Sequence, residues 1–387
     1  MKLAGVRVLD LALFLPGPHL TMMMADHGAE VIKVEPYDGG EPVRNLGLRK
    51  AGHSVWFRNT HRGKQSLRLN LKHPDGKEIL VRLAEKADVL VEGFRPGVME
   101  RLGVGYAHVA SRAPQLVYCS ISAFGQTGRY RDKPAHDMAV EALAGVLGLN
   151  LGADGRPTNP GIPAGDMGAS LMALSGILMA LLRQRQTGRG DYLDVSLYDS
   201  LLAWTPNVQG PVFAEHRPHV VKHERNWGGA AFYNVYETKD GRYIALGGVE
   251  HKFAENFLNK AGRADLIPLC HQPPGPVQDP VKDYLRELFA SQTLDEWTVW
   301  FEGVDVCWAP VRTLYDAMFD PATVERGMLL VDEQGVEHLG VPIRFTREPA
   351  SPDLRLPEFG EHSVAIVKNL GYGDGEIERL RAEHVIG

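Results

Sequence analysis

Short apolar runs alternate with longer amphipathic stretches along the first half of the chain. Val6–Leu11 and Ala29–Val34 have the unbroken apolar character of buried strands, and His19–His27 between them has a helical composition. Strands that alternate with helices form a parallel sheet covered on both faces, so this pattern predicts a doubly wound α/β fold. The same alternation continues through Ser66–Leu71, Pro74–Lys86, Asp88–Glu92, Val98–Leu102 and Leu116–Ile121.

Other stretches of this half have different patterns. Met138–Leu149 and Met167–Leu182 show apolar helical patterns and are predicted to be helices. Tyr192–Ser200 alternates as a strand does, but it also fits the start of the next helix. The polar, glycine-bearing segment Gly39–Gly63 predicts a long surface loop.

The second half of the chain changes character. Trp204–Arg225 has no periodicity and is rich in proline, histidine and polar residues, which is typical of a linker. In the stretch 232–248, two aromatic and β-branched runs flank Asp240-Gly241, which is a strong hairpin signal. A small α+β domain is completed by two predicted helices, Phe253–Ala261 and Val281–Phe289.

The length of 387 residues exceeds what one small core accommodates, so two domains are expected. The changes in pattern suggest where these domains begin and end. The predicted parts are the first part of a large domain at 1–203, a linker at 204–226, a small domain at 227–310, and a linker and return to the large domain at 311–387.

Composition narrows the class of protein. Hydrophobic residues make up 44% and charged residues 23%, as in ordinary globular proteins. The formal net charge of −6 argues against a general nucleic-acid binder. Cys119, Cys270 and Cys307 lie far apart without a CxxC motif, which fits a reduced, cytoplasmic protein without a zinc site. No segment approaches roughly 18 uninterrupted apolar residues, so no membrane span is expected.

Candidate chemistry lies just before the two apolar helical patterns. One loop ends in His136-Asp137 and the other in Gly165-Asp166. A carboxylate at the start of a helix faces unpaired backbone N–H groups and the positive end of the helix dipole. Each aspartate alone is most simply a helix cap, and a single histidine is usually structural. Two such loops that supply a histidine and aspartates nevertheless suggest a site.

Basic residues near the predicted strands are weaker candidates. Arg95 directly follows a strand, and the carboxyl ends of parallel strands are where ligands bind in such folds. Arg62 and Lys64 precede a strand, so topology says nothing about them. The turn after the first strand lacks GxGxxG, so the dinucleotide fingerprint is absent.

Several stretches that span nearly the whole chain carry a resemblance to a known family. They are LFLPGPHLTMMMADHGAEVIKVE (13–35), SLRLNLKHPDGKE (66–78), ADVLVEGFRPGVMERLGVGY (87–106), SISAFGQTGRYRDKPAHD (120–137), IPAGDMGAS (162–170), TGRGDYLDVSLYDS (187–200) and FYNVYETKDGRYIALGGVE (232–250). Each is weak alone, but their order is specific. The chain resembles the class III CoA-transferase (CaiB/BaiF) family and is most similar to its α-methylacyl-CoA racemases.

The resemblance implies a fold and an assembly. Family members have a Rossmann-like large domain built from both ends of the chain and a small inserted α+β domain, and two subunits form an interlocked homodimer. The active site lies where the large domain of one subunit meets the small domain of the other. Members carry an aspartate at the position that matches Asp166.

The family divides between two chemistries. In its transferases the aspartate attacks the acyl-CoA carbonyl, and a GGGGQ-type loop shields the intermediates. In its racemases a base removes the proton α to the thioester, and an acid on the other face returns one. WGGAAFY at 227–233 resembles the racemase loop GGAPFY. The resemblance thus favours racemisation of 2-methylacyl-CoA thioesters through an enolate. The alternative is CoA transfer from an acyl-CoA to a free carboxylic acid through Asp166.

In the racemase interpretation, Asp166 and His136 flank the α carbon and alternate as acid and base. His136 matches the histidine of a GHD-type motif, although Ala135 replaces its glycine. Glu250 matches the glutamate of an IEP-type motif, although His251 replaces its proline. Glu250 is expected from the partner subunit, where it would orient the imidazole of His136.

The remaining matched positions surround the substrate. Asp137 would orient the catalytic loop, or it would only cap a helix. Arg95, Arg62 and Lys64 match family positions near the CoA phosphates. Pro36 stands where family racemases often carry an arginine, so that contact is not expected here. Coenzyme A enters as part of the substrate, and neither another cofactor nor a metal is expected.

A non-catalytic acyl-CoA-binding protein is an alternative from another class. It would retain Arg95 but would not need Asp166, His136 and Glu250 together. The sequence does not identify the acyl group.

Overall fold

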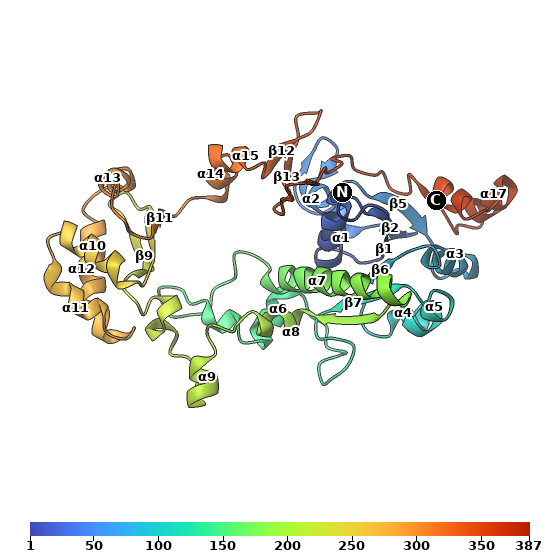
Figure 1. Cartoon of the computed structure of the whole chain (residues 1–387). Coiled ribbons are helices and arrows are strands. Elements are labelled where there is room, and N and C mark those ends of the chain that lie inside the picture. Colours follow the sequence, from blue (N-terminus) through green and yellow to red (C-terminus); the bar gives the residue numbers. More distant parts are fainter. The chain divides into compact units, whose positions relative to one another are not determined.

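The computed structural model describes residues 1–387, which divide into two compact units (Figure 1). The first unit comprises Met1–Ala144, Pro160–Trp204 and Phe319–Gly387, and the second comprises Gly145–Asn159 and Thr205–Met318. The large domain was expected to run without a break to residue 203, whereas residues 145–159 cluster with the second unit. Leu149 and Leu151 of this segment line a cavity together with residues from the sheet of the second unit.

A six-stranded parallel sheet forms the centre of the first unit (Figure 1). Its strands are β1 (Arg7–Asp10), β2 (Glu30–Pro36), β5 (Gln65–Leu69), β6 (Val89–Glu92), β7 (Val117–Ser122) and β8 (Tyr192–Ser196). Their order is β5-β2-β1-β6-β7-β8. The strands β2 and β5 therefore lie on one side of β1, and the strands β6, β7 and β8 lie on the other. The mixed α/β fold with a parallel sheet is therefore confirmed, and the loop after β1 lies at a point where such folds bind ligands.

Helices cover both faces of this sheet. On one face Thr21 of α1 donates a hydrogen bond of 2.7 Å to Asp10 of β1, and α7 packs beside α1. On the other face Leu9 and Ile32 share a core with helices that include the two at the C-terminus. The helices of the first unit are α1 (Pro16–Asp26), α2 (Val55–His61), α3 (Pro74–Ala84), α4 (Val98–Leu102), α5 (Tyr106–Arg112), α6 (Asp137–Leu143), α7 (Ala164–Thr187), α8 (Leu197–Ala203), α15 (Pro321–Glu325), α16 (Ser363–Asn369) and α17 (Asp374–Ala382).

The stretch Gly39–Gly63, predicted to be a long surface loop, is folded and partly buried. It contains a 3-10 turn η1 (Pro42–Arg44), strands β3 (Arg49–Lys50) and β4 (His53–Ser54), and α2. Phe57, Thr60 and His61 are buried. The prediction was wrong for much of this stretch because Glu41, Arg58 and Arg62 form ion pairs with residues from other parts of the unit. Only residues 45–52 are mostly exposed, as a surface loop would be.

The two predicted apolar helices have different limits in the structure. The first, expected to reach Leu149, ends at Leu143 as α6, and Gly145 then adopts a left-handed backbone with φ of 80°. The second is longer than expected and continues to Thr187 as α7. Both interpretations of Tyr192–Ser200 hold, because β8 ends at Ser196 and α8 starts directly after it.

Helix α7 is the one helix of the chain that is long and apolar enough to cross a membrane. By length and composition alone it could cross a membrane, because its glycine, serine and alanine positions interrupt the large apolar residues without making the helix polar. Of its most apolar window, 39% is buried inside the structure, and core helices of globular proteins meet the same criterion.

The second unit is built on a three-stranded antiparallel sheet in the order β11-β10-β9. The hairpin at Asp240-Gly241 is confirmed, and Gly241 has the φ of 72° that such a turn requires. Tyr236, Phe257 and Trp297 are buried in its core. Its elements are β9 (Tyr233–Glu237), β10 (Tyr243–Gly247), β11 (Trp308–Pro310), α9 (Gly210–Glu215), α10 (His251–Lys260), α11 (Ile267–Cys270), α12 (Asp279–Phe289), α13 (Leu294–Trp300) and α14 (Leu314–Met318). A hairpin of β12 (Leu329–Val331) and β13 (Glu337–Leu339) belongs to the first unit.

Candidate functional site

Asp166 lies in the first turn of α7, whose exposed amides are capped by side chains of α6. The N–H of Asp166 donates a 2.9 Å hydrogen bond to Asp137 Oδ1. The N–H of Ala164 donates a 3.1 Å hydrogen bond to Glu141 Oε1. Asp137 is thus a cap, but for the neighbouring helix and not for its own. The capping position of α7 itself is Pro163, so the carboxyl group of Asp166 does not serve as the cap.

Three carboxyl groups therefore meet at the start of α7. Burial, followed by the negative charges of Asp137 and Glu141, raises the pKa of Asp166 to about 7. Burial and the proximity of Asp137 also raise the pKa of Glu141. A carboxyl group whose pKa lies near neutrality is suited to accept and return protons in turn.

His136 directly precedes α6 and is adjacent in sequence to the residue that caps α7. Its imidazole is exposed. The ring of Phe14 meets it edge to face, with 6.1 Å between ring centroids and 82° between ring planes. Phe14 belongs to the loop after β1, so this loop and the starts of α6 and α7 come together in the first unit. The structure thus places Asp137 against Asp166 and Phe14 against His136, the residue before Asp137.

Two residues that the sequence reasoning missed lie in the same region. Glu141 follows Asp137 by four residues, which places both on one face of α6, and that spacing was a usable signal. His19 Nδ1 of α1 lies 2.8 Å from Ser170 Oγ of α7, one turn beyond Asp166. Burial, with the charge of Lys64, lowers the pKa of His19, so this imidazole is neutral and links the two helices.

Glu250 belongs to the second unit, where it precedes α10 and is exposed. The next residue, His251, stacks on His271 with 3.8 Å between ring centroids. The second unit also contains a cavity of about 480 Å³, to which Trp227 and Tyr233 of the WGGAAFY stretch contribute. The second unit therefore carries its own concave surface next to the matched loop.

The residues matched to CoA binding separate into two groups. Arg95 is exposed and follows Phe94, which lines a cavity of about 230 Å³. This cavity lies at the carboxyl ends of β2 and β5, the edge of a parallel sheet at which ligands bind in such folds. Its other lining residues include Leu11, Pro36, Tyr37, Leu69 and Leu71.

Arg62 and Lys64, in contrast, are buried and occupied by internal partners. Arg62 forms a bidentate pair with Asp26, at 3.0 Å and 2.7 Å. Lys64 Nζ lies 2.8 Å from Asp10 Oδ2 and 2.8 Å from the carbonyl oxygen of Pro18. Burial lowers the pKa of Lys64 to about 8 against the opposing effect of Asp10. We therefore assign both side chains to the interior of the fold and do not retain them as phosphate ligands.

No group of three or more histidine, cysteine, aspartate or glutamate side chains is arranged to hold a metal ion. The candidate chemistry thus rests on carboxyl, imidazole and backbone N–H groups.

Comparison with known proteins extends over nearly the whole chain. The family model of CoA-transferase family III matches residues 3–363. Alpha-methylacyl-CoA racemase of Homo sapiens is 33% identical, over 100% of this chain and 98% of that protein. Succinyl-CoA:glutarate CoA-transferase of Mus musculus is 31% identical, over 99% of this chain and 90% of that protein. The crystal structure of a CAIB/BAIF family protein from Brucella suis superposes with a TM-score of 0.83 at 28% identity, over 96% of this chain and 99% of that chain.

Proposed function

Because this chain belongs to CoA-transferase family III, we propose that it is an acyl-CoA-processing enzyme that racemises 2-methylacyl-CoA thioesters. The observation that carries the proposal is the carboxyl group of Asp166, whose pKa is raised to about 7 by burial and by Asp137 and Glu141. A racemase must use the same group as base for one enantiomer and as acid for the other, which a pKa near neutrality permits. A nucleophilic carboxylate would instead need to stay ionised.

In the proposed reaction, one of Asp166 and His136 removes the proton from the α carbon. The electron pair of the C–H bond moves toward the thioester carbonyl and gives an enolate. The other residue returns a proton to the opposite face of that carbon. The two residues have then exchanged protonation states, and the product has the opposite configuration.

The enolate oxygen needs hydrogen-bond donors, and the first turn of α7 offers them. The N–H groups of Ala164 and Asp166 are already bonded to side chains of α6. The N–H of Met167 donates to the carbonyl of Pro163. We assign the remaining N–H of this turn, that of Gly165, to the enolate oxygen.

We further propose that two copies of the chain form one site. Glu250 of the partner subunit would accept a hydrogen bond from His136 and orient its imidazole. Helix α7 supports an assembly, because one of its faces carries exposed large apolar side chains. These are Leu171, Met172, Leu178, Met179 and Leu182. Arg95 would bind a CoA phosphate beside the cavity of about 230 Å³. Cys119, Cys270 and Cys307 are unpaired, which fits a reduced, cytoplasmic protein.

Hydrogen exchange at the α carbon tests this function. A single enantiomer of a 2-methylacyl-CoA is incubated with the enzyme in D2O, without any free acid. We expect uptake of one deuteron at the α carbon together with loss of optical activity, and His136→Ala should abolish both. The absence of exchange across a panel of 2-methylacyl-CoA thioesters would reject racemisation.

CoA transfer is the second candidate, because a named CoA-transferase is nearly as similar to this chain as a named racemase. Asp166 would then attack the acyl carbonyl and displace CoA, giving a mixed anhydride. The CoA thiolate attacks the aspartyl carbonyl of this anhydride, which releases the donor acid and leaves an aspartyl-CoA thioester. The acceptor carboxylate takes CoA by the same two steps in reverse. Adding an acyl-CoA and a free carboxylic acid, followed by mass measurement of the intact protein, distinguishes the two functions. A covalent adduct on Asp166 and a new acyl-CoA would support transfer.

A further inference from the structure

Phe14 has an unusual backbone in the loop that joins β1 to α1. Its φ is 65°, in the left-handed region that bulky residues rarely adopt. Its ring is 37% exposed, so the conformation does not serve to bury the aromatic side chain in the core. Strained residues of this kind persist only where their surroundings fix them, and they are concentrated at functional sites.

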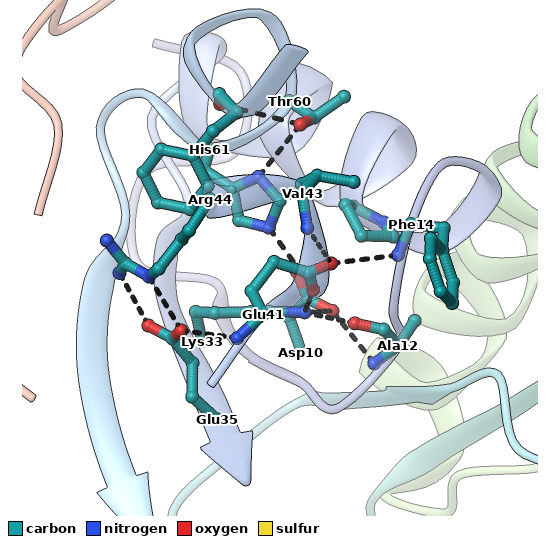
Figure 2. A network of polar contacts seen from close by, with 12 residues as sticks. Asp10, Ala12, Phe14, Lys33, Glu35, Glu41, Val43, Arg44, Thr60 and His61 are labelled. Carbon is teal, nitrogen blue, oxygen red and sulfur yellow. Dashed lines mark hydrogen bonds and ion pairs between the residues drawn. The ribbon is translucent and has the colours of Figure 1, made fainter. Parts of the chain in front are cut away.

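The backbone around Phe14 is fixed by buried charged side chains (Figure 2). The N–H of Phe14 donates a 3.0 Å hydrogen bond to Glu41 Oε1. Two residues earlier, the N–H of Ala12 donates to Asp10 Oδ1 at 3.1 Å, and the carbonyl of Ala12 accepts from Lys33 Nζ. Both peptide groups of this loop are therefore held by side chains that have no access to water.

Glu41 is in turn held in its ionised form. Its other oxygen lies 2.9 Å from Lys33 Nζ and 3.7 Å from His61 Nε2. Burial alone would raise the pKa of Glu41, but Lys33 and His61 outweigh it and hold that pKa well below its usual range. Burial lowers the pKa of His61 to about 4, so this imidazole is neutral and Lys33 supplies the positive charge. Glu41 thus remains a carboxylate acceptor for Phe14 at neutral pH.

The exposed ring of Phe14 ends at the candidate catalytic histidine. The ring centroids of Phe14 and His136 are 6.1 Å apart with the planes at 82°, the edge-to-face arrangement that aromatic rings favour. His136 is exposed and its side chain makes no hydrogen bond in the structure. The edge-to-face contact with the Phe14 ring is therefore available to orient the imidazole before substrate binds.

We propose that Phe14 is a positioning residue that orients the His136 imidazole for proton transfer, and that Glu41 maintains the left-handed backbone which presents the Phe14 ring. This inference rests on the proposed function, because it requires His136 to exchange protons with the substrate. Its structural half, the restriction of the imidazole by Phe14, can be measured without substrate.

The principal test is Phe14→Gly. Glycine accepts the left-handed backbone without strain but removes the ring. We expect kcat for α-carbon deuterium exchange to fall between about tenfold and a hundredfold, with KM changed less than about twofold, because binding is retained and orientation is lost. Phe14→Tyr, which keeps the ring edge, should recover most of kcat. The matched control is Ala51→Gly, which relieves another left-handed residue of the same unit (φ 46°), one that forms none of these hydrogen bonds or ring contacts.

The second measurement is NMR of histidine-labelled protein without substrate. We expect the His136 ring signals of Phe14→Gly to show averaged rotamers and the signals of Ala51→Gly to match wild type. Glu41→Gln keeps an oxygen acceptor but removes the charge, and it should give an intermediate loss of kcat if it folds. Wild-type kcat and an unchanged His136 signal in Phe14→Gly would overturn the inference. A different result would reject only the proposed function. In that case Phe14→Gly shows averaged His136 rotamers, but the wild-type protein itself catalyses no α-carbon exchange.

Discussion

Asp137 Oδ1 accepts a 2.9 Å hydrogen bond from the backbone N–H of Asp166, so one aspartate caps the helix that carries the other. The same contact that caps the first turn of α7 places a negative charge beside the Asp166 carboxyl group. A structural cap and an electrostatic influence on the candidate acid–base residue are therefore one interaction.

Asp137→Asn separates these two effects. Asparagine keeps an oxygen acceptor for the Asp166 N–H but removes the negative charge. We expect the pKa of Asp166 to move down from about 7 toward its ordinary range. The limb of the pH–rate profile of α-carbon exchange that reports Asp166 should therefore move to lower pH. A limb that stays in place would show that Asp137 has no electrostatic effect on Asp166.

Asp166→Asn should make the protein more stable above neutral pH. The folded-state pKa of Asp166 is raised to about 7, while the unfolded value is about 3.9. Between these values the folded state binds more protons than the unfolded state, so wild-type stability falls as pH rises through this window. We expect Asp166→Asn to have a higher urea midpoint than wild type at pH 8, and the two midpoints to converge near pH 4. Equal midpoints at pH 8 would contradict the raised pKa.

Arg62→Met should affect stability and not CoA binding. The substitution leaves Asp26 as a buried charge without its bidentate partner. Such losses reduce the free energy of unfolding by about 3–5 kcal/mol. Urea denaturation measures this loss, and Arg95→Met, at an exposed position, should change it by less than about 0.5 kcal/mol. A stable Arg62→Met protein with weakened CoA affinity would return Arg62 to the ligand site.

Arg95→Ala should weaken CoA binding with little effect on folding. Hydrogen bonds to charged groups contribute about 1.5–3 kcal/mol, so we expect at least a roughly tenfold increase in Kd for free CoA. Isothermal titration of the intact protein with CoA measures it. Arg101→Ala is the matched control, because this arginine lies on the neighbouring helix α4 and is exposed. Equal Kd values for both variants would remove Arg95 from the phosphate site.

Co-expression of two inactive variants tests the shared site. His136→Ala and Glu250→Gln chains, differently tagged, are purified as mixed assemblies. If Glu250 serves His136 of the partner subunit, each mixed dimer holds one site with both residues intact, and α-carbon exchange should return to about half of the wild-type rate per dimer. Native mass measurement verifies the mixed dimer. An inactive mixed dimer would place Glu250 and His136 in the same subunit or outside a common site.

The sequence predicted the elements whose apolar residues follow a simple period. Alternating strands and helices gave the parallel sheet, and Asp240-Gly241 gave the hairpin of the second unit. Periodicity does not identify a charged residue that is buried by its partner. Arg62 and Asp26 are separated by many residues, and both look solvated in the sequence.

The candidate site was accessible to sequence reasoning only in part. His136, Asp137 and Asp166 each precede or begin a helix, and this local signal was sufficient to select them. That Asp137 caps the other helix, and that Phe14 meets His136, depends on the packing of three separate segments. No regular spacing of residues in the sequence indicates such contacts.

Between α6 and α7 the chain departs to the second unit for residues 145–159 and then comes back. His136 thus precedes this segment in the sequence and Asp166 follows it. Neither unit is a continuous piece of polypeptide, so no single cut separates them. Replacement of the second unit by that of another protein would therefore require two separate segments, 145–159 and 205–318, to be exchanged together.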